Sequence, residues 1–162
     1  MKDVFCYSTL AGKIAIAALD DNITNVFFYN ETMVAKMNVK ETGVIREAAR
    51  QLHEYFAGQR QTFTLMLAPE GTPFQQSVWK ALQQIPYGKT SSYKDIAQKI
   101  GSPKAYRAVG MANNRNPIAI IIPCHRVIGA KGELVGYAGG LDVKSKLLEL
   151  EAKQVATKPL CL

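Results

Sequence analysis

The chain of 162 residues contains few of the side chains that build disulfide frameworks or metal sites. Its three cysteines, Cys6, Cys124 and Cys161, are odd in number and far apart, which favours free thiols in a reducing compartment. There are only two histidines, His53 and His125, and no Cys-x-x-Cys pair, which argues against a structural zinc site. We therefore expect neither a disulfide framework nor a bound metal.

Long apolar runs are also missing. No apolar stretch approaches the roughly 20 residues that a helix needs to span a bilayer, and the first residues lack a signal-peptide core. Hydrophobic residues make up 48% of the chain and charged residues 20%, as in globular proteins that fold in water. We therefore expect a cytoplasmic protein with one ordinary domain or two small ones packed together.

The net charge of +7 is unevenly distributed along the chain. Residues 1–73 contain 7 basic and 8 acidic side chains, whereas residues 74–162 contain 13 basic and 5 acidic ones. A basic half either binds a polyanion, with nucleic acid as the first candidate, or only keeps the surface solvated. Charge alone leaves both interpretations open.

The first half of the chain has the pattern of a small α+β unit. Strand-like segments at residues 5–9, 14–19 and 23–29 are separated by turn residues, and we expect a further strand at residues 63–67. Apolar residues at helical spacing predict a helix that ends at Gly58. These residues are Ile45, Ala48, Ala49, Leu52 and Phe56.

A segment rich in proline and glycine, residues 69–73, is the best candidate for a domain boundary. It separates the first half from the basic second half. We expect a subdomain at residues 1–73, a second domain at residues 74–155 and a tail at residues 156–162.

Capping signals predict three consecutive helices at the start of the second half. In the first, Thr72 and Gln75 form a capping box and Pro86 ends the helix. In the second, Ser92 caps the helix and Gly101 ends it. The third helix is expected to begin at once, because the next two residues are a serine and a proline.

The second and third helices match a helix-turn-helix. The third helix would present Lys104, Arg107 and Met111 to a partner. After it, a turn at residues 129–132 between two short strands would form a wing, and a last helix is expected over about residues 142–153. The buried stripe of the third helix would consist of Ala105, Ala108, Val109 and Ala112.

A candidate nucleophile lies in the sequence Pro123-Cys124-His125-Arg126-Val127, which follows the strand-like apolar run 118–122. A free cysteine has a pKa of about 8.5, so a nucleophilic role requires a nearby base or cation. His125 is the only histidine of the basic half. Because neighbouring side chains of a strand point to opposite faces, either the chain bends at Cys124 or a water relays the proton.

A carboxylate that fixes the tautomer of His125 would make the imidazole a better base. On the last helix, Glu151 falls between Leu147 and Leu148 on the inward-facing arc, whereas Glu149 falls on the solvent side. A carboxylate placed inward needs a partner, and His125 is the candidate. The alternative is that Glu151 extends into solvent near the chain end.

Together these residues resemble the O6-alkylguanine-DNA alkyltransferases, also called methylated-DNA–protein-cysteine methyltransferases. The resemblance covers most of residues 74–152. It implies an α+β fold, in which a small ribonuclease H-like antiparallel sheet with a helix precedes a winged helix-turn-helix domain. The segments that carry it are Asn116-Pro117, Ile122-Pro123-Cys124-His125-Arg126-Val127, Gly136-Tyr137-Ala138-Gly139-Gly140-Leu141, and Ser92-Tyr93 through Arg107-Ala108-Val109-Gly110.

The resemblance implies direct DNA repair. The family transfers an alkyl group from O6 of guanine, or less readily from O4 of thymine, to a cysteine that stays alkylated, without cofactor or metal. Cys124 would be the acceptor, and His125 the water-mediated base supported by Glu151. Asn116 would be the hinge between the active segment, residues 118–127, and the recognition helix, which is the third predicted helix. The partner would be double-stranded DNA bound through its minor groove with the damaged base flipped out, and we expect a monomer.

The resemblance also implies contacts to DNA and to the flipped base. Arg107 would insert into the base stack, and Tyr93 would reach the phosphate side of the target nucleotide and donate to the guanine. The main-chain carbonyls of Cys124 and Val127 would accept the guanine amino group. Further DNA contacts are expected from Lys104, Ala105 and Arg115. The walls of the pocket would be Tyr137, Ala138 and Gly139.

Two departures from the family pattern bear on fit. Ala138 stands where some members carry serine, which removes a hydroxyl contact that bears on inhibitor and substrate preference. Tyr106 beside the inserted arginine is bulkier than the small residue often found there, which affects stacking or groove fit.

Three other functions remain as alternatives. A non-catalytic alkyltransferase-like protein would sense lesions, but such relatives replace the acceptor cysteine, commonly by tryptophan, and Cys124 is present. A DNA-binding regulator would carry an incidental thiol. A thiol hydrolase using Cys124, His125 and Glu151 would turn over repeatedly, so the stoichiometry of reaction with methylated DNA separates these functions.

Overall fold

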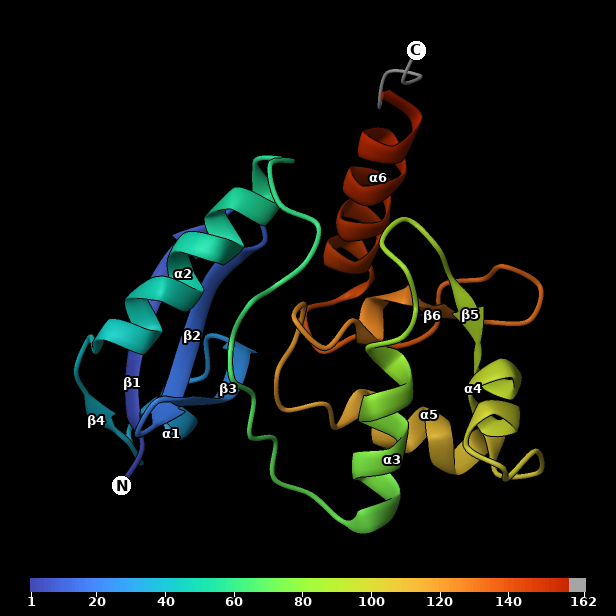
Figure 1. The fold of residues 1–162 in the computed structure, drawn as a ribbon, viewed down its shortest axis with the longest axis horizontal. Helices are drawn as coiled ribbons and strands as arrows, with labels where there is room; N and C mark the ends of the chain where they lie inside the picture. Colours follow the sequence, from blue (N-terminus) through green and yellow to red (C-terminus); the bar gives the residue numbers. More distant parts are fainter. Residues whose placement is uncertain (158–162) are drawn as a thin grey trace.

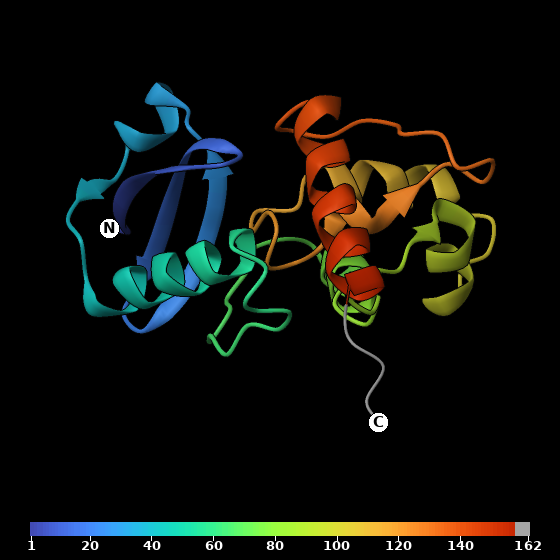
Figure 2. The same ribbon diagram turned by 90° about the horizontal axis from the view of Figure 1, so that it is seen from above.

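In the computed structural model, which describes residues 1–157, a sheet covered by one long helix lies beside a mostly helical second half (Figure 1). The view from above shows the two halves side by side (Figure 2). The last helix, α6 (Leu141–Thr157), includes the first two residues of the expected tail, and residues 158–162 lie outside the described residues. Within residues 1–157, no helix combines the length and apolarity needed to cross a membrane.

The first half contains a four-stranded sheet with the strand order β3-β2-β1-β4. Strands β1 (Asp3–Thr9), β2 (Gly12–Leu19) and β3 (Asn22–Phe28) form an antiparallel meander at the three predicted positions. The fourth strand, β4 (Asn38–Val39), pairs in parallel with β1. The predicted antiparallel sheet thus gains one parallel pair at this edge, which was not predicted because a pair of two residues leaves almost no pattern in the sequence.

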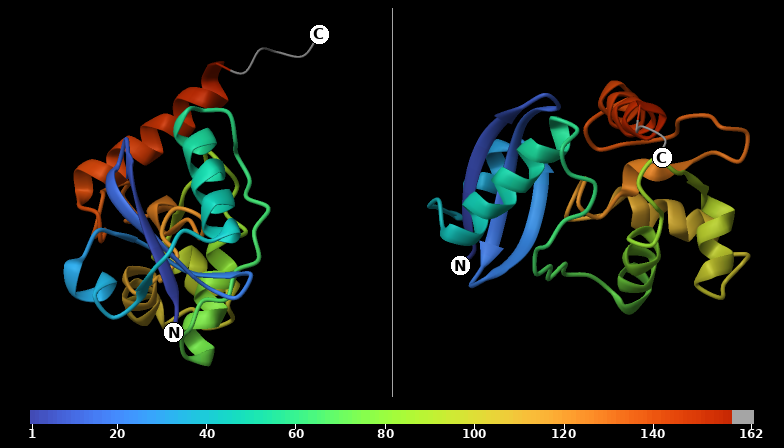
Figure 3. Two further views of the ribbon diagram at one scale, coloured as in Figure 1. Left: turned by 90° about the vertical axis from the view of Figure 1, so that its left-hand side faces the viewer. Right: turned by 45° about the horizontal axis from the view of Figure 1, so that its top comes forward.

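Helix α2 (Gly43–Phe56) packs across one face of the sheet, as both views of Figure 3 show. The side chain of Thr42 caps its start, and Gly58, with a φ of 75°, follows its end as predicted. The short helix α1 (Glu31–Val34) was not predicted. Its Val34 packs against the smaller core on the other face of the sheet, which consists of Val4, Ala15 and Ala17.

Two segments predicted as strands are irregular. Residues 63–67 and residues 118–122 each contribute one isolated parallel bridge to β3, the former at Ile23 and the latter at Val26. Both predictions are wrong because the two segments share the free edge of one strand, so neither obtains a run of ladder hydrogen bonds. After its bridge the second segment turns, with Ile120 in the left-handed region at a φ of 72°.

The second half begins with α3 (Pro73–Leu82), α4 (Tyr93–Lys99) and α5 (Tyr106–Asn114). Both predicted capping boxes, one before α3 and one before α4, are formed. Helix α5 begins later than predicted, because Ser102 to Ala105 form a turn that is closed by a backbone hydrogen bond of 2.9 Å. No side chain caps α5.

The late start of α5 changes which residues are covered. Val109 and Ala112 are buried as predicted, but Ala105 is half-buried in the cap position and Ala108 is exposed. The predicted four-residue stripe is therefore wrong at two positions. Ala108 lies on the flank of the α5 surface that packs against α3 and α4, next to the exposed Arg107.

The predicted wing is formed only in part. Strand β6 (Val127–Ile128) pairs in parallel with β5 (Ser91–Ser92), and the backbone turns at residues 129–132 as expected. The segment that follows the turn is not a strand. Because β6 pairs with the residues just before α4, it anchors the active segment to the start of that helix instead of forming a hairpin.

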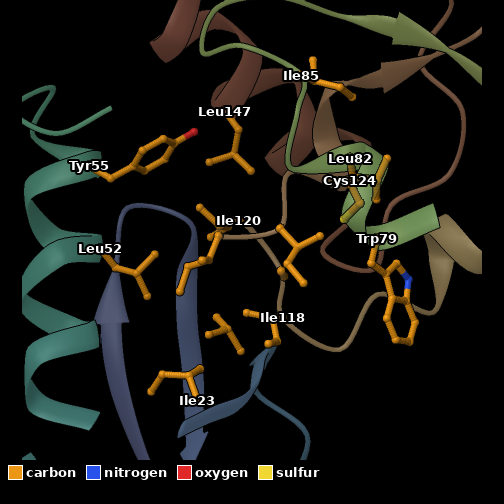
Figure 4. Close-up of a cluster of buried hydrophobic side chains, with 14 of the residues drawn as sticks. Ile23, Leu52, Tyr55, Trp79, Leu82, Ile85, Ile118, Ile120, Cys124 and Leu147 are labelled. Atoms are coloured by element: carbon orange, nitrogen blue, oxygen red, sulfur yellow. The ribbon is translucent and has the colours of Figure 1, made fainter. Parts of the chain in front are cut away.

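One apolar core joins the two halves of the molecule. Side chains from α2 and β3 meet side chains from the segment 118–122, from α3 and from α6, as the close-up shows (Figure 4). The chain around Cys124 is thereby packed against both halves. The labelled residues of this core are Ile23, Leu52, Tyr55, Trp79, Leu82, Ile85, Ile118, Ile120, Cys124 and Leu147.

Candidate active site

Cys124 is the first residue of a short 3₁₀ helix, η1 (Cys124–Arg126), which follows the buried segment 118–123. The side chain is buried, with 6% of the residue exposed. The chain therefore bends at the cysteine. A bend at Cys124 was one of the two arrangements expected from the sequence, the other being a water that relays the proton. In η1 the two neighbours are no longer held on opposite faces as they would be in a strand.

The surroundings of the Cys124 thiol act in opposite directions on its pKa. Burial raises the pKa above its ordinary value. The amide of Asn116, the positive charge of Lys144 and the backbone N–H groups of Cys124 and His125 lower it. Burial prevails, so the thiol needs a base to take its proton, while the surrounding dipoles and charge stabilise the thiolate once it forms.

Asn116 connects the end of α5 with the segment that leads to Cys124. Its Nδ2 donates to the carbonyl of Ile122 at 2.7 Å, and its Oδ1 accepts from the amide of Ile118 at 3.0 Å. The predicted hinge residue thus lies between these two segments, and its role as a hinge stays a prediction. Asn113, which the sequence analysis did not single out, adds a longer contact of 3.4 Å from Nδ2 to the carbonyl of Cys124.

His125 and Glu151 are in direct contact in the interior. The distance from His125 Nε2 to Glu151 Oε2 is 2.6 Å, and the two side chains are 0% and 1% exposed. The prediction that Glu151 points inward to His125 is confirmed, and the alternative of a solvent-exposed Glu151 is wrong. Because Nε2 faces a carboxylate, it carries the proton, which leaves Nδ1 as the acceptor nitrogen. Nδ1 is buried and has no hydrogen-bond partner among the described residues.

The protonation states of this pair follow from burial and from neighbouring charges. Burial lowers the pKa of His125; Glu151 opposes this shift, and the charges of Arg126 and Lys144 add to it. For Glu151, burial favours a raised pKa, but the hydrogen bonds and charges of His125 and Arg126 prevail and lower the pKa to about 2. At neutral pH the pair is therefore a neutral imidazole beside an ionised carboxylate.

Arg126 is a site residue that the sequence analysis quoted in the motif without assigning it a role. Its Nε donates to Glu151 Oε1 at 2.8 Å, its Nη2 to Oε2 at 3.2 Å, and its Nη1 to the carbonyl of Ile85 at 2.8 Å. This two-point contact supplies the positive charge that a buried carboxylate requires. Its place next to His125 in the motif was the signal that could have identified it.

Lys144 is a second residue that the sequence analysis missed. It is 0% exposed, and its Nζ donates to the carbonyls of Val135 at 2.9 Å and Gly136 at 3.3 Å. Burial lowers its pKa, and the nearby Cys124 opposes this shift. Helical spacing in the sequence could have identified Lys144, because it precedes Glu151 by two helical turns and so lies on the same inward face of the helix.

The residues predicted to contact DNA lie around α4 and α5. Lys104 and Arg107 are exposed at the start of α5, and Arg115 is exposed at its end. Ala105, in the cap position, is half-buried. Tyr93, the first residue of α4, is also half-buried.

Tyr93 links α4 and α5 to the segment that follows the turn at residues 129–132. Its hydroxyl donates to the carbonyl of Val135 at 3.1 Å, and its ring packs on Gly110 of α5. Burial raises the pKa of Tyr93, and the nearby Cys124 adds to the rise. The structure thus brings Tyr93 near the cysteine, whereas Arg107 and Lys104 face outward.

The predicted pocket residues are placed unevenly. Val127 is buried and Ala138 is exposed. Tyr137 packs edge-on against Phe28 of β3, with ring centroids 5.6 Å apart, and its hydroxyl is buried without a partner among the described residues. Gly139 also contacts Phe28, and a Cβ at this position would lie 2.7 Å from the ring. The glycine loop, residues 136–140, is therefore held against the sheet of the first half.

Comparison with known proteins identifies matching families for both halves. Residues 73–153 match the profile of the DNA binding domain of 6-O-methylguanine DNA methyltransferase, and residues 5–69 match the ribonuclease-like domain of the same protein. The predicted α+β fold, with a ribonuclease-like unit before a DNA-binding unit, is confirmed by these matches. The boundaries drawn at residues 73 and 155 stay predictions.

Individual relatives agree with these matches. A methylated-DNA–protein-cysteine methyltransferase of Methanosarcina barkeri is 71% identical over 106 residues, which are 65% of this chain and 67% of that protein. The constitutive methyltransferase of Bacillus subtilis is 51% identical over 150 residues, 88% of this chain and 91% of that protein. The crystal structure of Mycobacterium tuberculosis OGT in complex with DNA superposes with a TM-score of 0.88 at 46% identity, over 94% of each chain. The chain belongs to the 6-O-methylguanine DNA methyltransferase family, the methylated-DNA–protein-cysteine methyltransferases.

Proposed function

We propose that the protein repairs DNA by transferring a methyl or other alkyl group from O6 of guanine, or less readily from O4 of thymine, to the sulfur of Cys124. The observation that carries this proposal is a buried cysteine next to a His125–Glu151 pair in a chain of this family. The Bacillus subtilis relative, 51% identical, is named a constitutive methylated-DNA–protein-cysteine methyltransferase.

The reaction needs one proton transfer and one substitution at carbon. Nδ1 of His125 takes the thiol proton, directly or through a water, and Glu151 stabilises the resulting imidazolium. The sulfur of Cys124 attacks the alkyl carbon, so that a sulfur–carbon bond forms as the carbon–O6 bond breaks. The electron pair leaves on the guanine, which recovers the proton given up by the thiol. A thioether has no easy hydrolytic return, so each molecule acts once and needs no cofactor.

The alkyl group of a paired base is out of reach of a buried cysteine, so the nucleotide must leave the stack. Flipping costs a few kcal/mol, less for a damaged base, and contacts to the gap and to phosphates offset that cost. We propose that the side chain of Arg107 inserts into the base stack and fills the space that the flipped base leaves. Tyr93 acts near the target nucleotide after its hydroxyl leaves the carbonyl of Val135. Further contacts to the minor groove come from Lys104, Ala105 and Arg115.

The flipped base would bind over the active segment. The main-chain carbonyls of Cys124 and Val127 accept the amino group of guanine, and the side of the pocket is formed by Tyr137, Ala138 and Gly139. Asn116 keeps the end of α5 in register with this segment through its two hydrogen bonds. A monomer in the cytoplasm, where thiols stay reduced and DNA is present, fits this function.

The test is the stoichiometry of alkylation. The protein is incubated with an excess of duplex DNA that contains O6-methylguanine, and the intact protein and its peptides are analysed by mass spectrometry. We expect the gain of one methyl group on Cys124 and none in Cys124→Ala. Cys6→Ala, which changes a half-buried thiol on β1, serves as the matched control and should react normally.

The other outcomes identify the competing functions. Repeated turnover with unmodified Cys124 would indicate a thiol hydrolase. Tight binding to the damaged duplex without modification would indicate a lesion sensor, and equal binding to undamaged duplex without modification would indicate a DNA-binding regulator.

A further inference from the structure

The carboxylate of Glu151 accepts hydrogen bonds from several groups besides His125. Within residues 1–157 it accepts five hydrogen bonds: one from His125, two from Arg126, one from the backbone amide of Gly88 and one from the hydroxyl of Tyr55. Four of these come from the second half of the chain. The fifth comes from α2 of the first half, across a sequence separation of 96 residues.

Tyr55 and His125 use the same oxygen. The Tyr55 hydroxyl lies 2.5 Å from Glu151 Oε2, and His125 Nε2 lies 2.6 Å from it. All three residues are fully buried. A hydroxyl that donates to Oε2 fixes the orientation of the carboxylate and neutralises part of the negative charge on this oxygen. Both effects act on the imidazole of His125, which donates to the same oxygen.

We propose that Tyr55 is a positioning residue of the proton relay, through which the ribonuclease-like half sets the orientation and the basicity of the Glu151–His125 pair. The inference rests on the proposed function of Cys124. It gives the first half of the chain a part in the chemistry, which nothing in the sequence of that half indicated.

The tyrosine is a permanent donor in this position. Burial, and then the charge and hydrogen bond of Glu151, raise the pKa of Tyr55 far above its ordinary value. Its hydroxyl therefore stays protonated over the whole pH range in which the protein is folded, and the oxygen of Glu151 can only accept. Figure 4 shows this hydroxyl directed away from α2 toward the side of α6.

Other charged and titratable groups also face the pair and stay unchanged in the test below. Arg126 of η1 and Lys144 of α6 bring positive charge, and Cys124 titrates beside them. Two further tyrosines lie near the pair, Tyr87 before β5 and Tyr137 of the glycine loop. The negative charge of Glu151 contributes to raising the pKa of each.

Tyr87 provides a matched control. Its ring contacts that of Tyr55 edge-on, with centroids 6.2 Å apart, and faces the guanidinium of Arg126 at 5.6 Å. Its hydroxyl, unlike that of Tyr55, is buried without a hydrogen-bond partner among the described residues. Removal of this hydroxyl repeats the chemical change in the same cluster but leaves the five bonds of Glu151 intact.

The experiment compares the full-length Tyr55→Phe and Tyr87→Phe proteins with the unchanged protein. The pKa of His125 is read by NMR of the imidazole protons, and the exposed His53 is the internal reference. In Tyr55→Phe the oxygen loses a donor and offers more negative charge to the imidazole. We expect the pKa of His125 to rise by about half a unit. Tyr87→Phe should leave it unchanged.

The rate of alkylation by free O6-alkylguanine base, measured against pH, is the second readout. A base that is protonated cannot take the thiol proton, so the acid limb of the profile follows the pKa of His125. For Tyr55→Phe the limb should move to higher pH by the same half unit, with a rate about three-fold lower on the limb and little changed above it.

A second variant tests the opposite direction. Incorporation of 3-fluorotyrosine at position 55 keeps the ring and makes the hydroxyl a stronger donor, so the pKa of His125 should fall. This variant also keeps the test valid if Tyr55→Phe does not fold.

Two results would overturn the inference. One is a lower rate at all pH values with an unmoved pKa of His125, which indicates a purely structural tyrosine. The other is an equal shift in Tyr55→Phe and Tyr87→Phe, which rules out the bond to Glu151 as the cause. If the unchanged protein accepts no alkyl group, the proposed function fails, and the NMR titration still decides how Tyr55 acts on the Glu151–His125 pair.

Discussion

Single residues around Cys124 divide into a buried group, to which we assign the transfer of the proton, and an exposed group, which we propose to contact DNA. The buried group is charged, with Arg126 and Lys144 near one carboxylate and one thiol. Such charges are retained in an interior only with specific partners, and each of them has hydrogen bonds of 3.3 Å or less. By contrast, the exposed side chains of Lys104, Arg107 and Arg115 have no such hydrogen bonds among residues 1–157.

Arg107 belongs to the exposed group, and its removal tests the inserted-arginine assignment. Arg107→Ala should slow repair of duplex DNA by about ten-fold, because support for base flipping worth about 1–2 kcal/mol is lost. Reaction with the free alkylguanine base needs no flipping and should change by less than about two-fold. Lys80→Ala, an equal loss of charge on the exposed side of α3, is the control. Equal losses on both substrates would contradict the assignment.

Helices and strands were predicted with unequal success, for reasons that are local. The starts of α3 and α4 are set by capping boxes whose residues are three apart, so the sequence was sufficient. The start of α5 was predicted too early, because a serine followed by a proline is common in turns as well as at helix starts, and here these residues form the turn before the helix. The run 118–122 has the composition of a strand, but it finds only one bridging position on β3.

The cap of α4 offers a test at this scale. Ser92→Ala removes the side chain that accepts from the amide of Asp95, which should cost about 1 kcal/mol of stability and lower Tm by about 2–4 °C. Because Tyr93 is the first residue of this helix and β6 pairs with Ser92, duplex repair should slow as well.

Thr72→Ala is the matched change for this prediction, since Thr72 forms the same kind of capping box in α3. It should lower Tm similarly and leave the repair rate unchanged. Thermal unfolding and single-turnover kinetics of the two variants decide the matter. Equal slowing in both would mean that stability, and not the position of Tyr93, limits the rate.

The whole molecule is held together by a shared core and by the buried network of Glu151. Side chains from α2 and β3 pack against the active segment, Tyr55 donates to Glu151, and Phe28 supports the glycine loop. The first half therefore supports the site from two directions. No residue of this half could be assigned a catalytic role from the sequence, because the half contains no catalytic motif. It acts on the site only through tertiary contacts.

The buried relay should make the stability of the whole molecule sensitive to acid. The pKa of His125 is lowered in the folded state, so the unfolded chain binds a proton first as pH falls below about 6.5. The pKa of Glu151 is lowered to about 2, so its contribution is lost as pH falls further, from about 4.5 toward 2. Urea unfolding at several pH values should show a free energy of unfolding that declines from pH 7 downward.

A substitution separates the two parts of this decline. Glu151→Gln should be less stable at pH 7, because Arg126 stays buried without its anionic partner. It should also lose the dependence on pH below about 4.5 that comes from this carboxylate. A free energy of unfolding that stays level between pH 7 and pH 5 in the unchanged protein would contradict the account.

Local sequence was enough for the three-strand meander, the capping boxes at Thr72 and Ser92, and the motif around Cys124. These features depend on side chains a few residues apart, which the backbone brings together in any fold. The inward direction of Glu151 also followed from helical spacing. The tertiary structure alone decided that Tyr55 shares an oxygen of Glu151 with His125. Such a contact joins segments far apart in the chain, and only the packing of the two halves brings them together.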